Sequence, residues 1–231
     1  LVVHSSSEAL DVDALLQDKK VTRLFLPLHD FFHSLEGQQN VAAHTNGQEF
    51  NLLFFGHIRE YKGLDILLRA LPLVLERYPA VRLHIAGEMF FKDSRPVGVH
   101  HAEAKDPLRL ITELGLEDIV TTDIRYIPNE EIPTIFSRAD AVVFPFRSAT
   151  QSGSLTVAYS YSKPVIATRV GGLPDVVRDG ISGFLVEPES STALAGGIIK
   201  CIEETPSSES VMSVAEELSW RRYVDGLLDG R

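Results

Sequence analysis

The sequence has a single cysteine, Cys201, one tryptophan and two methionines in 231 residues. One cysteine cannot form a disulfide within the chain, which excludes a disulfide-stabilised scaffold and favours a reducing compartment. No apolar run approaches the roughly 20 residues that a membrane-spanning helix needs. We therefore expect a cytoplasmic protein that does not span a membrane.

Basic residues are also scarce, with 22 lysines and arginines against 32 acidic residues and a net charge of −10. A nucleic-acid partner requires a broad basic surface, so this balance argues against nucleic-acid binding. A small anionic ligand remains compatible, because a local cluster of donors can override the overall field. The hydrophobic content of 44% is typical of a globular chain with an ordinary core.

Residues that could bind a metal occur in two places, and neither pattern is convincing. Asp11 and Asp13 form an Asp-x-Asp pair in the first turn of a predicted helix, where acids are favoured by the helix dipole. His100 and His101, with Glu103 and Asp106 nearby, lack a second pair at ligand spacing. We expect no metal site and no cofactor.

The most informative stretch runs from residue 141 to residue 173 and reads as strand, loop, helix, strand and loop. Ala141–Phe144 is typical of a buried parallel strand, and Pro145 ends it because proline has no N–H for the ladder. Small polar residues then lead into a helix predicted to start at Leu155, so backbone N–H groups converge at its N-terminus and form an anion site. The residues expected to bind the anion are Thr150, Gln151, Ser152, Gly153, Ser154, Leu155 and Thr156.

A second loop with binding potential follows the apolar strand 51–55. It begins at Gly56 and carries Arg59 and Lys62 ahead of a predicted helix at 64–75, whose leucines recur at helical spacing. Loops of this kind lie at the carboxyl edge of a parallel sheet, where open α/β sheets bind ligands. Arg59 can present a planar fork to phosphate oxygens and Lys62 a compact charge; the alternative is that both are solvated loop charges.

The stretch KPVIATRVGGLPDVVRDGISGFLVEP, residues 163–188, resembles the donor-binding signature of the group 1, or family 4, glycosyltransferases. These are retaining enzymes with two facing Rossmann-like domains, the GT-B fold. Three upstream stretches resemble the same family in the same order, and the likeness covers roughly residues 50 to 204: FFGHIREYKGLDILLRAL, LHIAGE and YIPNEEIPTIFSRADAVVFP. The resemblance implies an α/β fold with a Rossmann-like parallel sheet and helices on both faces, the C-terminal half of the GT-B architecture.

The resemblance also implies a division of the chain into three parts. We interpret residues 1–46 as the remnant of an N-terminal acceptor domain with its hinge, and residues 47–204 as the donor-binding domain. Residues 205–231 are expected to form helices that cross back towards the N-terminal domain. Because two-domain transferases of this kind are much longer, and because the first residue is Leu1, we expect the chain to be a fragment.

The reaction implied by the resemblance transfers a sugar from a nucleoside diphosphate sugar, with a UDP-sugar favoured, to an acceptor hydroxyl with retention of configuration. Arg59 and Lys62 would bind the donor diphosphate next to Gly56, without a metal ion. Tyr126 and Ile127 match the turn at which the family binds the nucleobase, with core packing as an equal alternative. The acceptor, a glycan or a lipid-linked glycan, would bind the absent domain, which could also attach the protein to the inner face of a membrane.

The sequence departs from the family in one respect. Two glutamates eight positions apart, one toward the donor sugar and one toward the ribose, are replaced here by Ala149 and Val157. Three interpretations remain: the residues Thr150 to Gly153 take their place, the alignment is locally shifted, or the domain binds nucleotide without catalysis. We favour the first, because the basic loop and the glycines remain.

Other functions are also compatible with the alternation of strands and helices. One is a nucleotide-sugar-binding module without turnover, and another is a nucleotide-sugar epimerase of the same double-Rossmann plan. A dinucleotide-dependent oxidoreductase ranks last, because the turn Gly56-His57-Ile58-Arg59 lacks the glycine pattern that a pyrophosphate needs.

Overall fold

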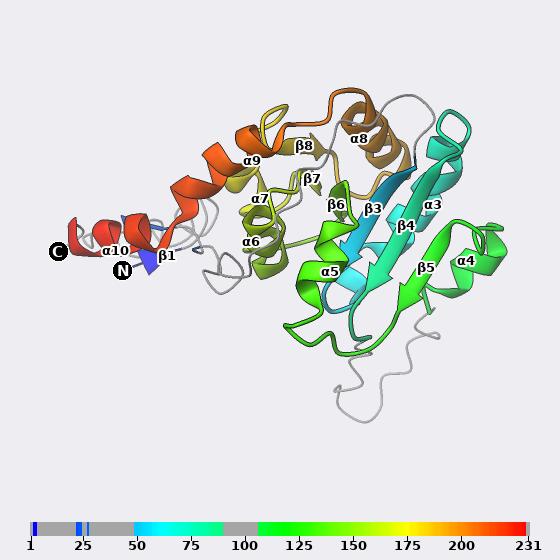
Figure 1. Ribbon diagram of the computed structural model, residues 1–231, viewed down its shortest axis with the longest axis horizontal. Helices are drawn as coiled ribbons and strands as arrows, with labels where there is room; N and C mark the ends of the chain where they lie inside the picture. Colours follow the sequence, from blue (N-terminus) through cyan, green and yellow to red (C-terminus); the bar gives the residue numbers. More distant parts are fainter. Residues whose placement is uncertain (1, 4–21, 25–26, 28–48, 90–105, 230–231) are drawn as a thin grey trace.

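The computed structural model describes residues 2–3, 22–24, 27, 49–89 and 106–229. Figure 1 shows one large parallel sheet with helices packed on both of its faces. A second, two-stranded sheet lies at one end, beside the two termini (Figure 1). The predicted Rossmann-like α/β architecture is therefore confirmed.

The large sheet has six parallel strands in the order β5-β4-β3-β6-β7-β8. Counted from its first strand, this is the order 3-2-1-4-5-6 of dinucleotide-binding α/β folds, in which the chain winds outward twice from the middle. The switch point lies between β3 and β6, where the carboxyl ends of adjacent strands lead to helices on opposite faces of the sheet. The strands are β3 (Phe50–Phe55), β4 (Val81–Ala86), β5 (Val120–Asp123), β6 (Ala141–Phe144), β7 (Val165–Thr168) and β8 (Gly183–Val186).

Helices cover both faces of this sheet because its central strands are apolar on both sides. Leu52 and Phe54 point into one core and Leu53 into the other, as the two-residue period of a strand requires. The first face carries α3 (Leu64–Leu75), α4 (Arg109–Glu113) and α8 (Ser191–Glu203). The second face carries α5 (Ile132–Ser137), α6 (Gly153–Ser160), α7 (Leu173–Val176) and α9 (Ser208–Ala215).

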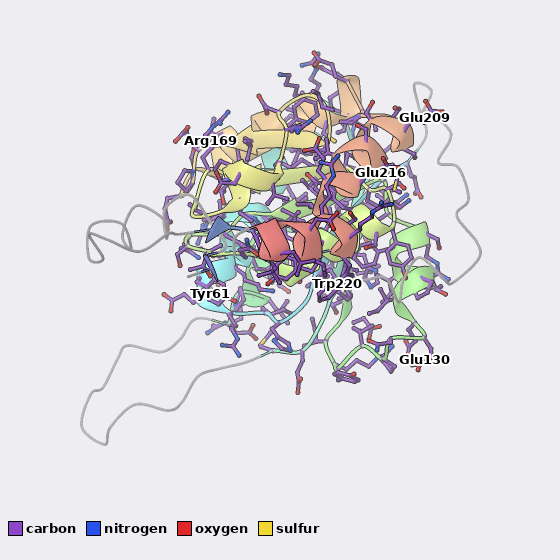
Figure 2. All side chains as sticks on the ribbon, turned by 90° about the vertical axis from the view of Figure 1, so that its left-hand side faces the viewer. Tyr61, Glu130, Arg169, Glu209, Glu216 and Trp220 are labelled. Carbon is purple, nitrogen blue, oxygen red and sulfur yellow. The ribbon has the colours of Figure 1, made fainter. Side chains whose placement is uncertain are left out.

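The C-terminal segment leaves the large sheet after α9. It continues through the 3-10 turn η2 (Glu216–Leu218) into α10 (Trp220–Asp229), which reaches the small sheet of β1 (Val2–Val3) and β2 (Thr22–Arg23). Gly226 of α10 lies so close to Leu24 that a Cβ added to this glycine would be 2.4 Å from Leu24 Cδ2. Figure 2 looks onto this end of the molecule, with Trp220 labelled on α10 in front.

The predicted division into three parts stays a prediction. Most of the expected N-terminal remnant, including Asp11 and Asp13, lies outside the described residues, as do His100, His101 and Glu103. In the part of the chain that the structure describes, no helix is both long enough and apolar enough to cross a bilayer.

Candidate functional site

The candidate site lies at the switch point of the sheet, where the β3–α3 loop and the β6–α6 loop meet. The 3-10 turn η1 (Glu60–Lys62) belongs to the first of these loops, and the N-terminus of α6 follows the second. Two adjacent parallel strands, β3 and β6, bring the loops together although their residues are far apart in sequence. Ligands of open α/β sheets bind at such a point.

Gly56 marks the place where the two loops converge. Its φ of +102° lies in the region that glycine tolerates and other residues rarely adopt. A Cβ added here would be 2.7 Å from Ser154 Oγ and 3.1 Å from Lys62 Nζ. The glycine therefore leaves room for a hydroxyl and an ammonium group to face the same small volume.

Lys62 is a buried cation, with only 7% of its surface exposed. Burial, and then the positive charge of Arg59, lower the pKa of Lys62 to about 8. Its Nζ also lies 5.5 Å from the centre of the Phe146 ring, a cation–π distance. Arg59 is half-buried and begins the same turn, since its carbonyl accepts a hydrogen bond of 3.0 Å from the backbone N–H of Lys62.

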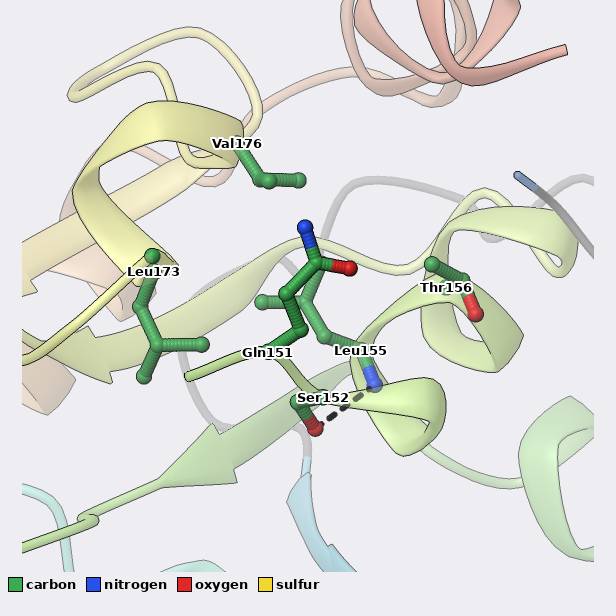
Figure 3. Close-up of a pocket in the computed structure, with 7 residues that line it drawn as sticks. Gln151, Ser152, Leu155, Thr156, Leu173 and Val176 are labelled. Carbon is green, nitrogen blue, oxygen red and sulfur yellow. Dashed lines mark hydrogen bonds between the residues drawn. The ribbon is translucent and has the colours of Figure 1, made fainter. Parts of the chain in front are cut away.

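The helix α6 supplies the second part of the site. Ser152 caps it by accepting a hydrogen bond of 3.3 Å from the backbone N–H of Leu155, drawn as a dashed line in Figure 3. The helix begins at Gly153, two residues earlier than the predicted start at Leu155. Within the described residues, the N–H groups of Gly153 and Ser154 donate to no acceptor, so both are available to an anion.

Four of the predicted loop residues also line a small pocket beside the start of α6. Figure 3 shows the Gln151 side chain between the first turn of α6 and the two apolar side chains of α7. Beside the pocket, the Gly172 N–H donates a hydrogen bond of 3.0 Å to the Thr150 carbonyl, which joins the β6–α6 and β7–α7 loops. Its lining residues are Gln151, Ser152, Leu155, Thr156, Gly172, Leu173 and Val176.

The two predicted base contacts have different environments. Tyr126 follows β5 and is 65% exposed, whereas the Ile127 side chain is 8% exposed and packs in the core beneath α5. β5 lies two strands from β3, at one edge of the sheet, so these residues stand apart from the cluster around Gly56. Contact with a nucleobase stays a prediction for both residues.

Ala149 and Val157, at the two positions where the family carries glutamates, have different surroundings. Ala149 is half-buried in the β6–α6 loop, where its carbonyl lies against Gly171. Val157 lies on α6 with 6% of its surface exposed and packs in the second core. Among the candidate substitutes, Thr150 and Gly153 are exposed at the surface.

The structure adds one residue that the sequence analysis did not identify. Arg147 donates hydrogen bonds of 2.9 and 2.7 Å to the two carboxylate oxygens of Asp65 and one of 2.6 Å to the Glu60 carbonyl. Asp65 and Arg147 are 82 positions apart, so no local pattern could reveal the pair. The available signal was Arg147 itself, a basic residue at the carboxyl edge of a predicted strand.

A family model described as "Glycosyl transferases group 1" matches residues 49–204 of this chain. The chain belongs to this family. It is 34% identical, over 76% of its length and 38% of the relative, to a D-inositol 3-phosphate glycosyltransferase of Mycolicibacterium smegmatis. It is also 31% identical to the same enzyme of Mycolicibacterium vanbaalenii, over 100% of this chain and 52% of the relative. The chain thus spans about half the length, or less, of these curated relatives.

Several solved structures are similar to this chain in fold. Sucrose-phosphate synthase from Thermosynechococcus elongatus has a TM-score of 0.75 at 22% identity, covering 99% of this chain and 56% of that one. HepE of Anabaena, solved in complex with UDP, has a TM-score of 0.71 at 22% identity and covers 99% and 61%. Together with the strand order, these similarities confirm the predicted fold, a Rossmann-like half of the GT-B architecture.

Proposed function

We propose that this chain is the donor-binding half of a retaining glycosyltransferase that uses a nucleoside diphosphate sugar, with UDP as the favoured nucleotide. The acceptor hydroxyl would belong to a glycan or a lipid-linked glycan and would bind the other half of the protein, in the synthesis of a polysaccharide or glycoconjugate. Family membership supports sugar transfer. The choice of UDP is supported by the solved complexes of HepE with UDP and with UDP-glucose.

The observation that carries the proposal is the convergence of two kinds of anion donor on Gly56. Lys62 Nζ and Ser154 Oγ both lie within 3.1 Å of the position that a Cβ would occupy there. The free N–H groups at the start of α6 belong to the same loop as Ser154. A diphosphate bound here would meet a cation, a hydroxyl and a helix N-terminus at once.

These groups also suit the chemistry of the reaction. The departing diphosphate gains negative charge while the sugar becomes oxocarbenium-like, so catalysis depends on donors that are already in place around the leaving group. Arg59, Lys62 and the backbone N–H groups of α6 would supply this stabilisation without a metal ion. The leaving phosphate itself would accept the proton of the acceptor hydroxyl, so that the protein need not provide a general base.

Calorimetric titration with UDP, GDP and ADP, in the presence of a chelator, tests the proposal directly. We expect one of the three to bind saturably to the 231-residue chain, and UDP to bind most tightly. Binding with the chelator present would support a site that needs no metal. Absence of binding by all three would contradict the assignment of the donor site.

The affinity for UDP should fall as the pH rises from 7 to 9. The pKa of Lys62 is lowered to about 8 by burial and by Arg59, so its ammonium charge is lost across this interval. We expect the Kd to increase about tenfold at pH 9. Lys62→Met keeps an apolar stem in place and should make the Kd independent of pH; a wild-type Kd that stays constant from pH 7 to 9 would contradict the role of Lys62.

The same lowered pKa has the opposite effect on folding. The folded state holds this proton less tightly than the unfolded chain, whose lysine keeps the ordinary pKa of 10.5. The contribution of Lys62 to the free energy of unfolding therefore rises with pH between about 8 and 10.5. A loss of affinity at pH 9 can thus be separated from unfolding by a melting curve at each pH.

A second candidate function is nucleotide-sugar binding without turnover. The replacement of both family glutamates by Ala149 and Val157 favours it, because neither side chain can accept a hydrogen bond from a sugar or ribose hydroxyl. Transferase and binding module differ in one measurement, the release of UDP from a UDP-sugar by the longer protein that contains both halves. Release above the buffer rate supports the transferase, whereas tight binding without release supports the module.

A further inference from the structure

Arg147 joins three loops at the carboxyl edge of the sheet. Its guanidinium donates to Asp65 at the start of α3 and to the Glu60 carbonyl in η1, and its Nε lies 3.0 Å from a carboxylate oxygen of Glu189 in the β8–α8 loop. The backbone N–H of Arg147 also donates a hydrogen bond of 2.7 Å to the Tyr61 carbonyl. Both the side chain and the main chain of this residue therefore hold the turn that carries Lys62.

The residue before Arg147 also contacts this turn. Phe146 is buried, with its ring 6.1 Å from the Tyr61 ring in an edge-to-face arrangement and 5.5 Å from Lys62 Nζ. Phe146 and Arg147 thus contact every residue of η1. Because they belong to the same loop as the capped start of α6, they couple the position of Lys62 to that of Ser154.

The charge of Arg147 is directed at protein carboxylates. Burial by itself would raise the pKa of Asp65, but the hydrogen bond and the charge of Arg147 outweigh it and hold that pKa below its ordinary value. Glu189, the second carboxylate, has a left-handed backbone with a φ of +58°, a conformation that costs energy for a residue with a side chain. Because its guanidinium is already paired with two carboxylates, Arg147 is poorly suited to bind a phosphate.

We propose that Arg147 is a positioning residue, which fixes the turn Glu60–Lys62 against the β6–α6 loop. This arrangement lets Lys62 and the start of α6 bind the same diphosphate. The inference rests on the proposed function, since it concerns the same site. The planar fork of the guanidinium is essential to this role, because it binds Asp65 through two nitrogens and still reaches Glu60 and Glu189. A lysine at this position would keep the charge but not the geometry.

The experiment compares Arg147→Lys with Arg169→Lys. Arg169 is a matched control: it is exposed, lies 3.9 Å from Asp179 and 3.7 Å from Glu187, and among the described residues makes no hydrogen bond or ion pair to η1. UDP, GDP and ADP are first titrated into the wild type, and the tightest is then used with its monophosphate. We expect Arg147→Lys to weaken diphosphate binding at least fivefold and monophosphate binding less than twofold, and Arg169→Lys to change neither. General damage to the fold would instead weaken the binding of both nucleotides equally and lower the melting temperature.

Asp65→Asn provides a second, independent variant. If Arg147 positions the turn, loss of its main partner weakens diphosphate binding; if Arg147 itself bound phosphate, its release from Asp65 would strengthen binding and overturn the inference. A wild type that binds none of the three nucleotides would refute the proposed function and this inference together. A wild type that binds, with Arg147→Lys and Asp65→Asn unchanged, would refute only the role of Arg147.

Discussion

Replacement of Gly153 by glutamate is expected to abolish UDP binding while leaving the fold intact. Gly153 is the first residue of α6, is exposed, and has an N–H without an acceptor among the described residues. A carboxylate here would occupy the position of the diphosphate and repel it. We expect the affinity to fall at least a hundredfold, which corresponds to about 2.7 kcal/mol, as measured by calorimetric titration.

The fold should tolerate this change for a specific reason. Gly153 is helical, so a side chain adds no backbone strain, and an acid in the first turn of a helix interacts favourably with the helix dipole. The melting temperature should therefore stay constant or rise slightly. Gly153→Gln, which has the same size without the charge, separates repulsion from blockage and should bind UDP better than Gly153→Glu. A Kd of Gly153→Glu within twofold of the wild type would show that the diphosphate binds elsewhere.

The second large effect is expected for Lys62→Met. The substitution removes the ammonium group that faces Ser154 Oγ across Gly56 but keeps an apolar chain against Phe146. A charge-assisted hydrogen bond contributes about 1.5–3 kcal/mol, so the Kd for UDP should rise at least tenfold. Arg59→Ala should have an effect in the same range.

The melting temperature distinguishes loss of the ammonium group from structural damage to the site. Lys62 is buried without a carboxylate within ion-pair distance in the described part of the chain, so its charge is disfavoured by burial. Lys62→Met should therefore preserve or raise the melting temperature at pH 7. Arg69→Met, which removes an exposed cation from α3, is the control for net charge and should leave the Kd unchanged. Equal affinities of Lys62→Met and Arg69→Met would contradict the phosphate-binding role of Lys62.

The order of strands and helices in residues 49–204 could be predicted because each element has a strong local signal. Strands such as Ala141–Phe144 and Val165–Thr168 are continuous apolar runs, which parallel strands buried on both faces require. The sequence predicts the start of α6 two residues too late, because this start is marked by a single cap hydrogen bond, between Ser152 and Leu155, and not by a hydrophobic period. Small residues in a predicted loop gave no reason to begin the helix earlier.

Candidate site residues that lie on one loop could be proposed from the sequence. Arg59, Lys62 and Gly56 belong to one strand–helix turn, and Ser152 to Ser154 belong to another. The identity of these residues determines what they can donate. Their relative positions could not be predicted, because β3 and β6 become neighbours only when the chain crosses from the edge strand β5 to the other side of β3.

The sequence by itself determined the family and the alternation of strands and helices, and it indicated the two loops that we propose to bind an anion, because each depends on residues close together in the chain. Tertiary structure decided that Lys62 and Ser154 lie on the same side of Gly56 and that Lys62 is buried with a lowered pKa. It also decided that Arg147 forms hydrogen bonds with the turn that carries Lys62. Those properties depend on packing between segments more than 80 residues apart, such as Asp65 and Arg147. Burial, charge and distance across such contacts exist only in the folded chain.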